Sequence, residues 1–155
     1  MANQDPQPEI YQVTSAFTGG GTAAIGDNVV TNIQTSQANN EEVRIYALMV
    51  NITDGAGAQI SKLTGADIDF SVQITVGPNN IPSNAFNITG VFASESQMLT
   101  FPSPILVLYQ YPLQVTVTSN QALAANRTVS IQLISELALQ KVAGTYTDSD
   151  FPRSR

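Results

Sequence analysis

The chain of 155 residues contains no histidine, no cysteine and no tryptophan, and only 12% of it is charged. Soluble domains average about 25% charged residues, so about half of the usual ionisable side chains are missing. Histidine and cysteine are the side chains that most often act as general acids and bases, nucleophiles and transition-metal ligands. The composition therefore points away from an enzyme, and it predicts no catalytic residue, no metal ligand and no cofactor.

Positive charge is also scarce, with six lysine and arginine residues and a net charge of −6. So few cations form no basic stripe that could neutralise phosphates, which excludes a nucleic-acid partner. The longest apolar runs, at 45–50 and 105–109, are too short for a membrane span. The N-terminus is polar and has no signal-peptide pattern. We therefore expect a soluble protein made in a cytoplasm, without export and without a membrane span.

Composition divides the chain into three zones. Residues 1–41 are rich in Gln, Asn, Thr and Gly and contain the run Gly19-Gly20-Gly21, for which we expect a flexible hinge. Residues 42–140 carry the strong periodic patterns, and residues 141–155 form a polar tail. The first zone has two interpretations of equal weight. It is either an arm that docks by strand addition on its own domain or on a neighbour, or the first two strands of the domain itself.

The central zone alternates between apolar and polar residues, which is typical of strands with one buried face. The alternation is clearest at 67–76, 113–117 and 129–133. The nearly continuous apolar segment 43–52 predicts a central strand or one buried on both faces, and shorter strands are expected at 85–93, 98–101 and 105–109. Because proline donates no ladder hydrogen bond, Pro102, Pro104 and Pro112 predict bends or sheet edges. We expect an all-β fold, a single jelly-roll-like β-sandwich with an extended N-terminal arm.

The carboxylates are the remaining candidates for a chemical site. Asp67 and Asp69 fall on the polar face of the strand predicted at 67–76, where solvated surface is the expected state. The alternatives are a calcium site or a hydrolytic carboxylate pair. Asp54 opens a glycine-rich loop that lacks the ligand spacing of an EF-hand and is better explained as a loop tip.

A surface with little charge resists association weakly, and interface cores are depleted in charge. The composition therefore favours a protein that acts through contacts. The residues expected at subunit interfaces are Ile10, Tyr11, Val13 and Phe17 in the N-terminal zone, with Tyr109, Tyr111 and Phe151 as interface aromatics.

Three segments together resemble the closing strands of small jelly-roll structural proteins of bacteriophage and virus particles. They are the proline-flanked apolar segment 101–107, the segment 111–117 and the alternating segment 127–133. A departure is Gln110-Tyr111-Pro112, where those proteins often have a glycine. The resemblance implies a virion component, such as a capsid, head-decoration, minor capsid or fibre-base protein. It also implies a homo-oligomer, with a trimer expected first, in contact with other capsid or virion proteins. The alternative is a carbohydrate-binding or adhesin-type β-sandwich module, with calcium held by Asp54, Asp67 or Asp69.

Overall fold

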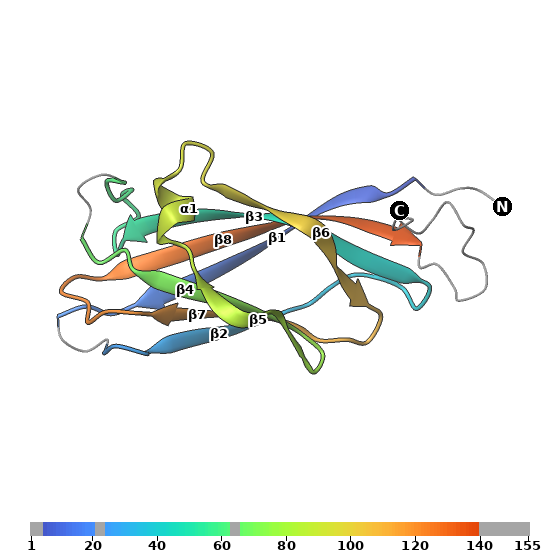
Figure 1. Ribbon diagram of the computed structural model, residues 1–155, viewed down its shortest axis with the longest axis horizontal. Helices are drawn as coiled ribbons and strands as arrows, with labels where there is room; N and C mark the ends of the chain where they lie inside the picture. Colours follow the sequence, from blue (N-terminus) through green and yellow to red (C-terminus); the bar gives the residue numbers. More distant parts are fainter. Residues whose placement is uncertain (1–4, 21–23, 63–65, 140–155) are drawn as a thin grey trace, which may run out of the picture.

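The computed structural model describes residues 5–20, 24–62 and 66–139, which form eight strands and one short helix (Figure 1). In chain order they are β1 (Gln7–Phe17), β2 (Asn28–Ile33), β3 (Glu41–Asp54), β4 (Phe70–Val76), β5 (Asn79–Asn87), α1 (Thr89–Ala93), β6 (Met98–Leu108), β7 (Leu113–Ser119) and β8 (Arg127–Leu139). No helix in these ranges is long and apolar enough to cross a membrane. The expectation of an all-β protein is confirmed.

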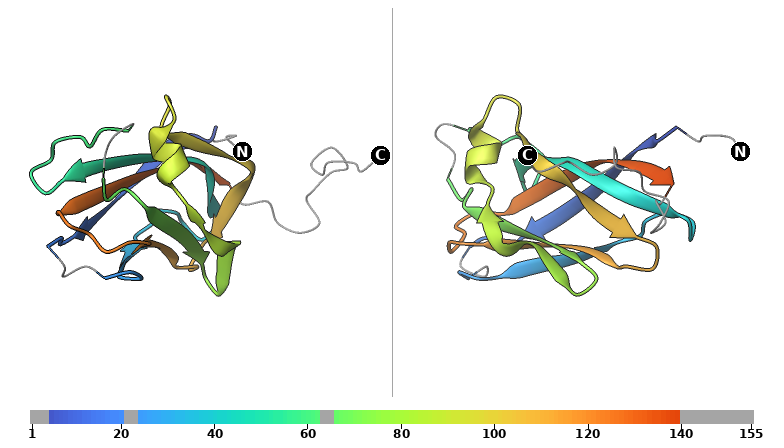
Figure 2. Two further views of the ribbon diagram at one scale, coloured as in Figure 1. Left: turned by 60° about the vertical axis from the view of Figure 1, so that its left-hand side comes forward. Right: turned by 45° about the vertical axis from the view of Figure 1, so that its right-hand side comes forward.

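The strands form two four-stranded antiparallel sheets, β1-β8-β3-β6 and β2-β7-β4-β5, which lie one over the other in Figure 2. Their pairing is nested. The first strand pairs with the eighth, the second with the seventh, the third with the sixth and the fourth with the fifth. Residues 7–17 and 28–33 are thus the first strands of the two sheets, which is one of the two interpretations of the N-terminal zone. An arm is not needed to account for them.

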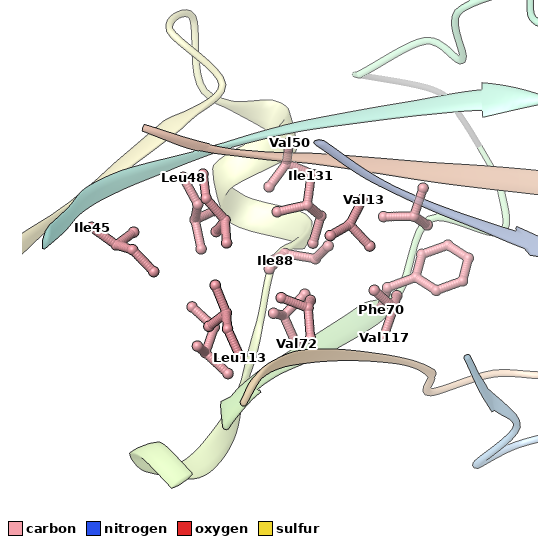
Figure 3. Packing of buried hydrophobic residues seen from close by; sticks show 14 of the residues in the cluster. Val13, Ile45, Leu48, Val50, Phe70, Val72, Ile88, Leu113, Val117 and Ile131 are labelled. Carbon is pink, nitrogen blue, oxygen red and sulfur yellow. The ribbon is translucent and has the colours of Figure 1, made fainter. Parts of the chain in front are cut away.

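One apolar cluster fills the space between the sheets, because successive strand residues point to opposite faces (Figure 3). In β4 the alternate residues Phe70, Val72, Ile74 and Val76 are all buried, and the residues between them are only partly covered. The Phe70 ring packs on Phe17 of β1, with ring centroids 5.1 Å apart and an angle of 46° between the planes. The alternation predicted from 70 to 76 is therefore the core face of the second sheet.

β3 lies between β8 and β6, as expected for a central strand. Its pairing shifts register between Ile45 and Ala47 with both neighbours. On β6, residues 101–104 lie between the paired residues Thr100 and Ile105 and have no partner on β3. The two prolines of β6 fall in this bulge, where no ladder hydrogen bond is lost. The strands predicted separately at 98–101 and 105–109 are consequently one edge strand.

The strand predicted at 85–93 is wrong beyond Asn87. β5 ends there, and the one-turn helix α1 follows at Thr89–Ala93. The N–H of Phe92 donates to the carbonyl of Ile88 at 2.9 Å, so the two side chains share one side of the turn. Both are fully buried. The turn carries the chain from one sheet to the other while it fills the core beside the edge strands.

Candidate functional site

An apolar groove with a volume of about 540 Å³ lies along the edge strands β5 and β6. β5 is an edge strand of one sheet and β6 is an edge strand of the other, so the groove lies along an edge of both sheets. The residues that line it carry no charge: Ile81 and Phe86 from β5, and Leu99, Thr100, Phe101, Pro102, Ser103 and Ile105 from β6. We call this surface the β5–β6 groove. Ile81, Phe86, Leu99 and Phe101 are partly buried against the core, so the groove presents their remaining apolar surface, which is typical of contact sites.

The β6 bulge explains how the groove arises. Phe101, Pro102 and Ser103 are three of the four bulge residues, and none of them is tied to β3. A bulge bends the strand and redirects its side chains. Prolines at a sheet edge also prevent another strand from extending the sheet. The groove is therefore suited to side-chain packing rather than to strand addition.

The sheet beside the groove, β2-β7-β4-β5, contains no charged residue in any of its four strands. Apart from Val30, the outer faces of β2, β7 and β4 carry amides and hydroxyls. Gln114 donates from Nε2 to Asn32 Oδ1 at 2.9 Å, and the Thr75 hydroxyl donates to Asn80 Oδ1 at 3.0 Å. A face without ions can be covered by a partner without the desolvation cost of a charge.

The aromatic residues predicted at an interface do not lie in the groove. Tyr109 and Tyr111 are 42% and 47% exposed, and both line a smaller hollow of about 240 Å³ beside Ile33 and Gln37. They remain available for contact. Phe151 lies outside the described residues.

Of the N-terminal candidates, two are part of the core. Val13 and Phe17 face the core and are 1% and 5% exposed, which removes them from the candidate contact surface. Ile10 points outward and is 63% exposed. Tyr11 is half-buried, and burial followed by the nearby charge of Glu9 raises the pKa of its phenol. Only Ile10 and part of Tyr11 can therefore meet a partner.

The expectation that Asp67 lies on the solvated face of a strand is wrong. β4 begins at Phe70, and Asp67 is buried at 8% exposure with a φ of 58°. Its carboxylate accepts hydrogen bonds from the backbone N–H groups of Ala124 and Ala125, each at 3.2 Å, and from Gln121 Nε2 at 3.1 Å. These contacts fasten the loop between β7 and β8 to the segment that precedes β4.

Asp69 is also outside the strand. Its Oδ1 accepts from Asn87 Nδ2 at 2.6 Å and from Asn120 Nδ2 at 3.0 Å. Asp54 Oδ1 accepts from the N–H groups of Ala56 and Ala58 at 2.9 and 2.8 Å, which closes its loop. Among the described residues there is no group of three or more acidic, histidine or cysteine side chains that could hold a metal ion. These carboxylates organise loops.

The glycine run does not form a hinge at its first two positions. A Cβ atom at Gly19 would lie 2.1 Å from the carbonyl carbon of Ala125, so only glycine fits against this loop. The N–H of Gly19 donates to Asn126 Oδ1 at 2.8 Å, and the N–H of Gly20 donates to the carbonyl of Ala124 at 3.0 Å. Both glycines are anchored to the β7–β8 loop.

No protein-family model, no curated protein and no solved structure matches this chain.

Sequence reasoning missed the residues of the β5–β6 groove. The prolines correctly indicated an edge near 102–104, since β6 is an edge strand. Leu99, Phe101, Ile81 and Phe86 are apolar residues within strands, as core residues are, and all four pack partly against the core. Only the pairing of β6 with β3 reveals the bulge that opens a groove beside them.

Proposed function

We propose that this protein is a non-enzymatic structural subunit of a virus or bacteriophage particle, a capsid, capsid-decoration or related assembly component that acts through contacts between subunits. The observation that carries the proposal is the apolar, uncharged β5–β6 groove. Water-exposed apolar surface gains about 25 cal/mol for each Å² that a partner covers.

The topology supports a jelly-roll sandwich. Eight strands paired first to eighth, second to seventh, third to sixth and fourth to fifth correspond to a long antiparallel hairpin rolled into two sheets. This double Greek key recurs in viral capsid domains and in lectin domains. The closing strands β6, β7 and β8 cover most of the segments that resemble phage particle proteins.

We further propose that the partner at the groove is a second copy of the chain. The net charge of the chain is −6, so two copies repel wherever their carboxylates approach one another. The groove is lined by uncharged residues and adjoins a sheet with no charged residue. Contact there brings no carboxylates together. Closed symmetry is the rule for soluble homo-oligomers, and we expect a trimer first, on the resemblance to particle proteins.

The test is sedimentation velocity and native mass spectrometry of the full chain. The wild-type protein is expected to assemble, and Phe101→Lys is expected to weaken assembly strongly, because it places a charge in the groove. Ile25→Lys is the control, since Ile25 is 73% exposed in the segment between β1 and β2 and does not line the groove. Circular dichroism verifies that both variants fold. A wild-type protein that stays monomeric at high concentration and binds no particle contradicts the proposal.

The runner-up, a calcium-assisted carbohydrate or adhesin module, gives a different result. Calcium bound only to the folded state would raise the melting temperature. No rise at millimolar calcium eliminates the calcium-assisted form.

A further inference from the structure

A second pocket, of about 330 Å³, lies on the outer face of the sheet β1-β8-β3-β6. It is separate from the β5–β6 groove and shares no lining residue with it. Five of its eight lining residues are amides and none is charged. The register places the residues together, because Gln12 of β1 lies opposite Gln132 of β8, and Gln132 lies opposite Met49 of β3.

Two buried atoms of this pocket lack a hydrogen-bond partner among the described residues. They are Asn51 Oδ1, which is an acceptor, and Gln97 Nε2, which is a donor. Buried polar groups are normally paired, and leaving one unpaired costs free energy. Asn51 Oδ1 and Gln97 Nε2 make no hydrogen bond within the protein, so either atom can bond to a ligand without breaking an existing hydrogen bond of its own.

The backbone of Gln97 supplies an independent observation. Its φ is 52°, in the left-handed region that favours glycine. The strained residue is held in place, since its carbonyl accepts from the N–H of Val50 at 2.8 Å and its own N–H donates to the carbonyl of Ser94. Strain that the surroundings maintain at a pocket is a recurring feature of binding sites.

We propose that this pocket binds a neutral saccharide of one or two rings. A hydroxyl group donates one hydrogen bond and accepts another, so the hydroxyls of a sugar can supply the donor that Asn51 Oδ1 lacks and the acceptor that Gln97 Nε2 lacks.

The rest of the lining fits the same chemistry. Each of the side chains Gln12, Gln59 and Gln132 carries an acceptor oxygen and two N–H donors, which match neighbouring hydroxyls on a sugar ring. Met49 offers an apolar surface for the C–H face of the ring. The absence of charge in the lining disfavours phosphorylated or acidic sugars. The volume is near the lower end of the range for small-molecule sites, about 300–1,000 Å³.

The test is a set of ¹H–¹⁵N correlation spectra of the full chain titrated with glucose, galactose, mannose and N-acetylglucosamine. At least one of these sugars is expected to shift the backbone amides of 49–51, 97 and 130–132 with a millimolar Kd. Gln97→Gly is the decisive variant. It removes the amide and relieves the backbone strain, so binding is expected to weaken about tenfold or more while stability is kept or raised.

Asn51→Ala is a second variant that removes the acceptor. Gln114→Ala is the matched control, because Gln114 is a partly covered glutamine on the outer face of the other sheet. Loss of sugar binding in both pocket variants, with the control unchanged, supports the proposal.

Three results overturn it. They are no shift with any of the four sugars, shifts that survive Gln97→Gly and Asn51→Ala, or equal shifts at the same amides from N-methylacetamide, which would assign the pocket to a peptide group. The proposal does not depend on assembly at the β5–β6 groove, because the sedimentation of Gln97→Gly is expected to match that of the wild-type protein.

Discussion

Nη2 of Arg127 lies 3.8 Å from Oδ2 of Asp67, in a buried ion pair at the end of the fold where β8 begins. Arg127 also donates from Nε and Nη2 to the carbonyl oxygen of Ala66, at 3.2 and 2.9 Å. The pair joins the start of β8 to the segment before β4, and these belong to different sheets. It is thus a polar link across the two layers, outside the apolar core.

We predict that Asp67→Asn lowers the free energy of unfolding by about 3 kcal/mol, because it leaves the Arg127 charge buried without its counter-ion. Asparagine tolerates the left-handed backbone at this position, so the loss reports on charge and hydrogen bonding rather than on strain. Urea unfolding at neutral pH measures the difference. The control is Glu95→Gln, at an exposed position, which we expect to change stability by less than about 0.5 kcal/mol. Equal effects of the two substitutions would contradict a stabilising role for the pair.

Alanine substitutions at Gly19 and Gly20 should have different costs, because Gly19 lies against the Ala125 backbone and Gly20 has open space around it. We predict that Gly19→Ala destabilises the fold by about 2–3 kcal/mol, since its Cβ would collide with the backbone of Ala125. Gly20 has a φ of 75° and open space around it, so Gly20→Ala is expected to cost about 1 kcal/mol from backbone strain alone. Thermal unfolding of both variants checks the order. A flexible hinge at these residues would instead make both substitutions nearly neutral.

The sequence predicts the strands better than it predicts their ends and contacts. Asp67 and Asp69 continue the alternation of β4, yet the left-handed φ of Asp67 places both before the strand begins. The partners of Asp67 are Gln121, Ala124, Ala125 and Arg127, which are distant in sequence. No local pattern shows that these groups meet.

The sequence of the N-terminal zone is ambiguous for a related reason. The inward face of β1 carries Val13, Ser15 and Phe17, and Ser15 is fully buried although it is polar. A serine at a core position interrupts the apolar alternation by which a strand is identified. The two candidate sites depend on strand pairing in the same way, since both the β6 bulge and the amide pocket combine residues from separate strands.

Tyr46 leads to a prediction about alkaline stability. Its side chain lies at the bulge of β3, where its hydroxyl donates to the carboxylate of Glu136. Burial, followed by the hydrogen bond and charge of Glu136, raises the pKa of the Tyr46 phenol above its ordinary value of 10.0, although Arg44 acts in the opposite direction.

The pKa of the Tyr46 phenol is higher in the folded state than its ordinary value of 10.0, which applies to the unfolded chain. The protonated phenol therefore stabilises the fold. This stabilisation is fully present below pH 10.0 and is lost as the pH rises through the folded-state pKa. We therefore predict that the wild-type protein loses stability above this pH more steeply than Tyr46→Phe does. Between pH 6 and about 8 the difference between the two proteins is expected to be constant, because the phenol is protonated in both states there. Parallel curves across the whole range would contradict the prediction.

The last prediction concerns the role of β1, for which Phe17 and Ile10 make a matched pair. Phe17 is 5% exposed and packs against Phe70, whereas Ile10 is 63% exposed on the opposite face of the same strand. Phe17→Ala is expected to cost about 3–5 kcal/mol because it opens a cavity in the core, and Ile10→Ala about 0.5 kcal/mol or less. Guanidinium unfolding at low protein concentration measures both values. If β1 were a detachable arm, Phe17→Ala would leave the unfolding of the remaining strands nearly unchanged and would alter only association. A large loss of stability with Phe17→Ala, together with a near-neutral Ile10→Ala, makes β1 an integral strand whose outer face alone is free to meet a neighbour.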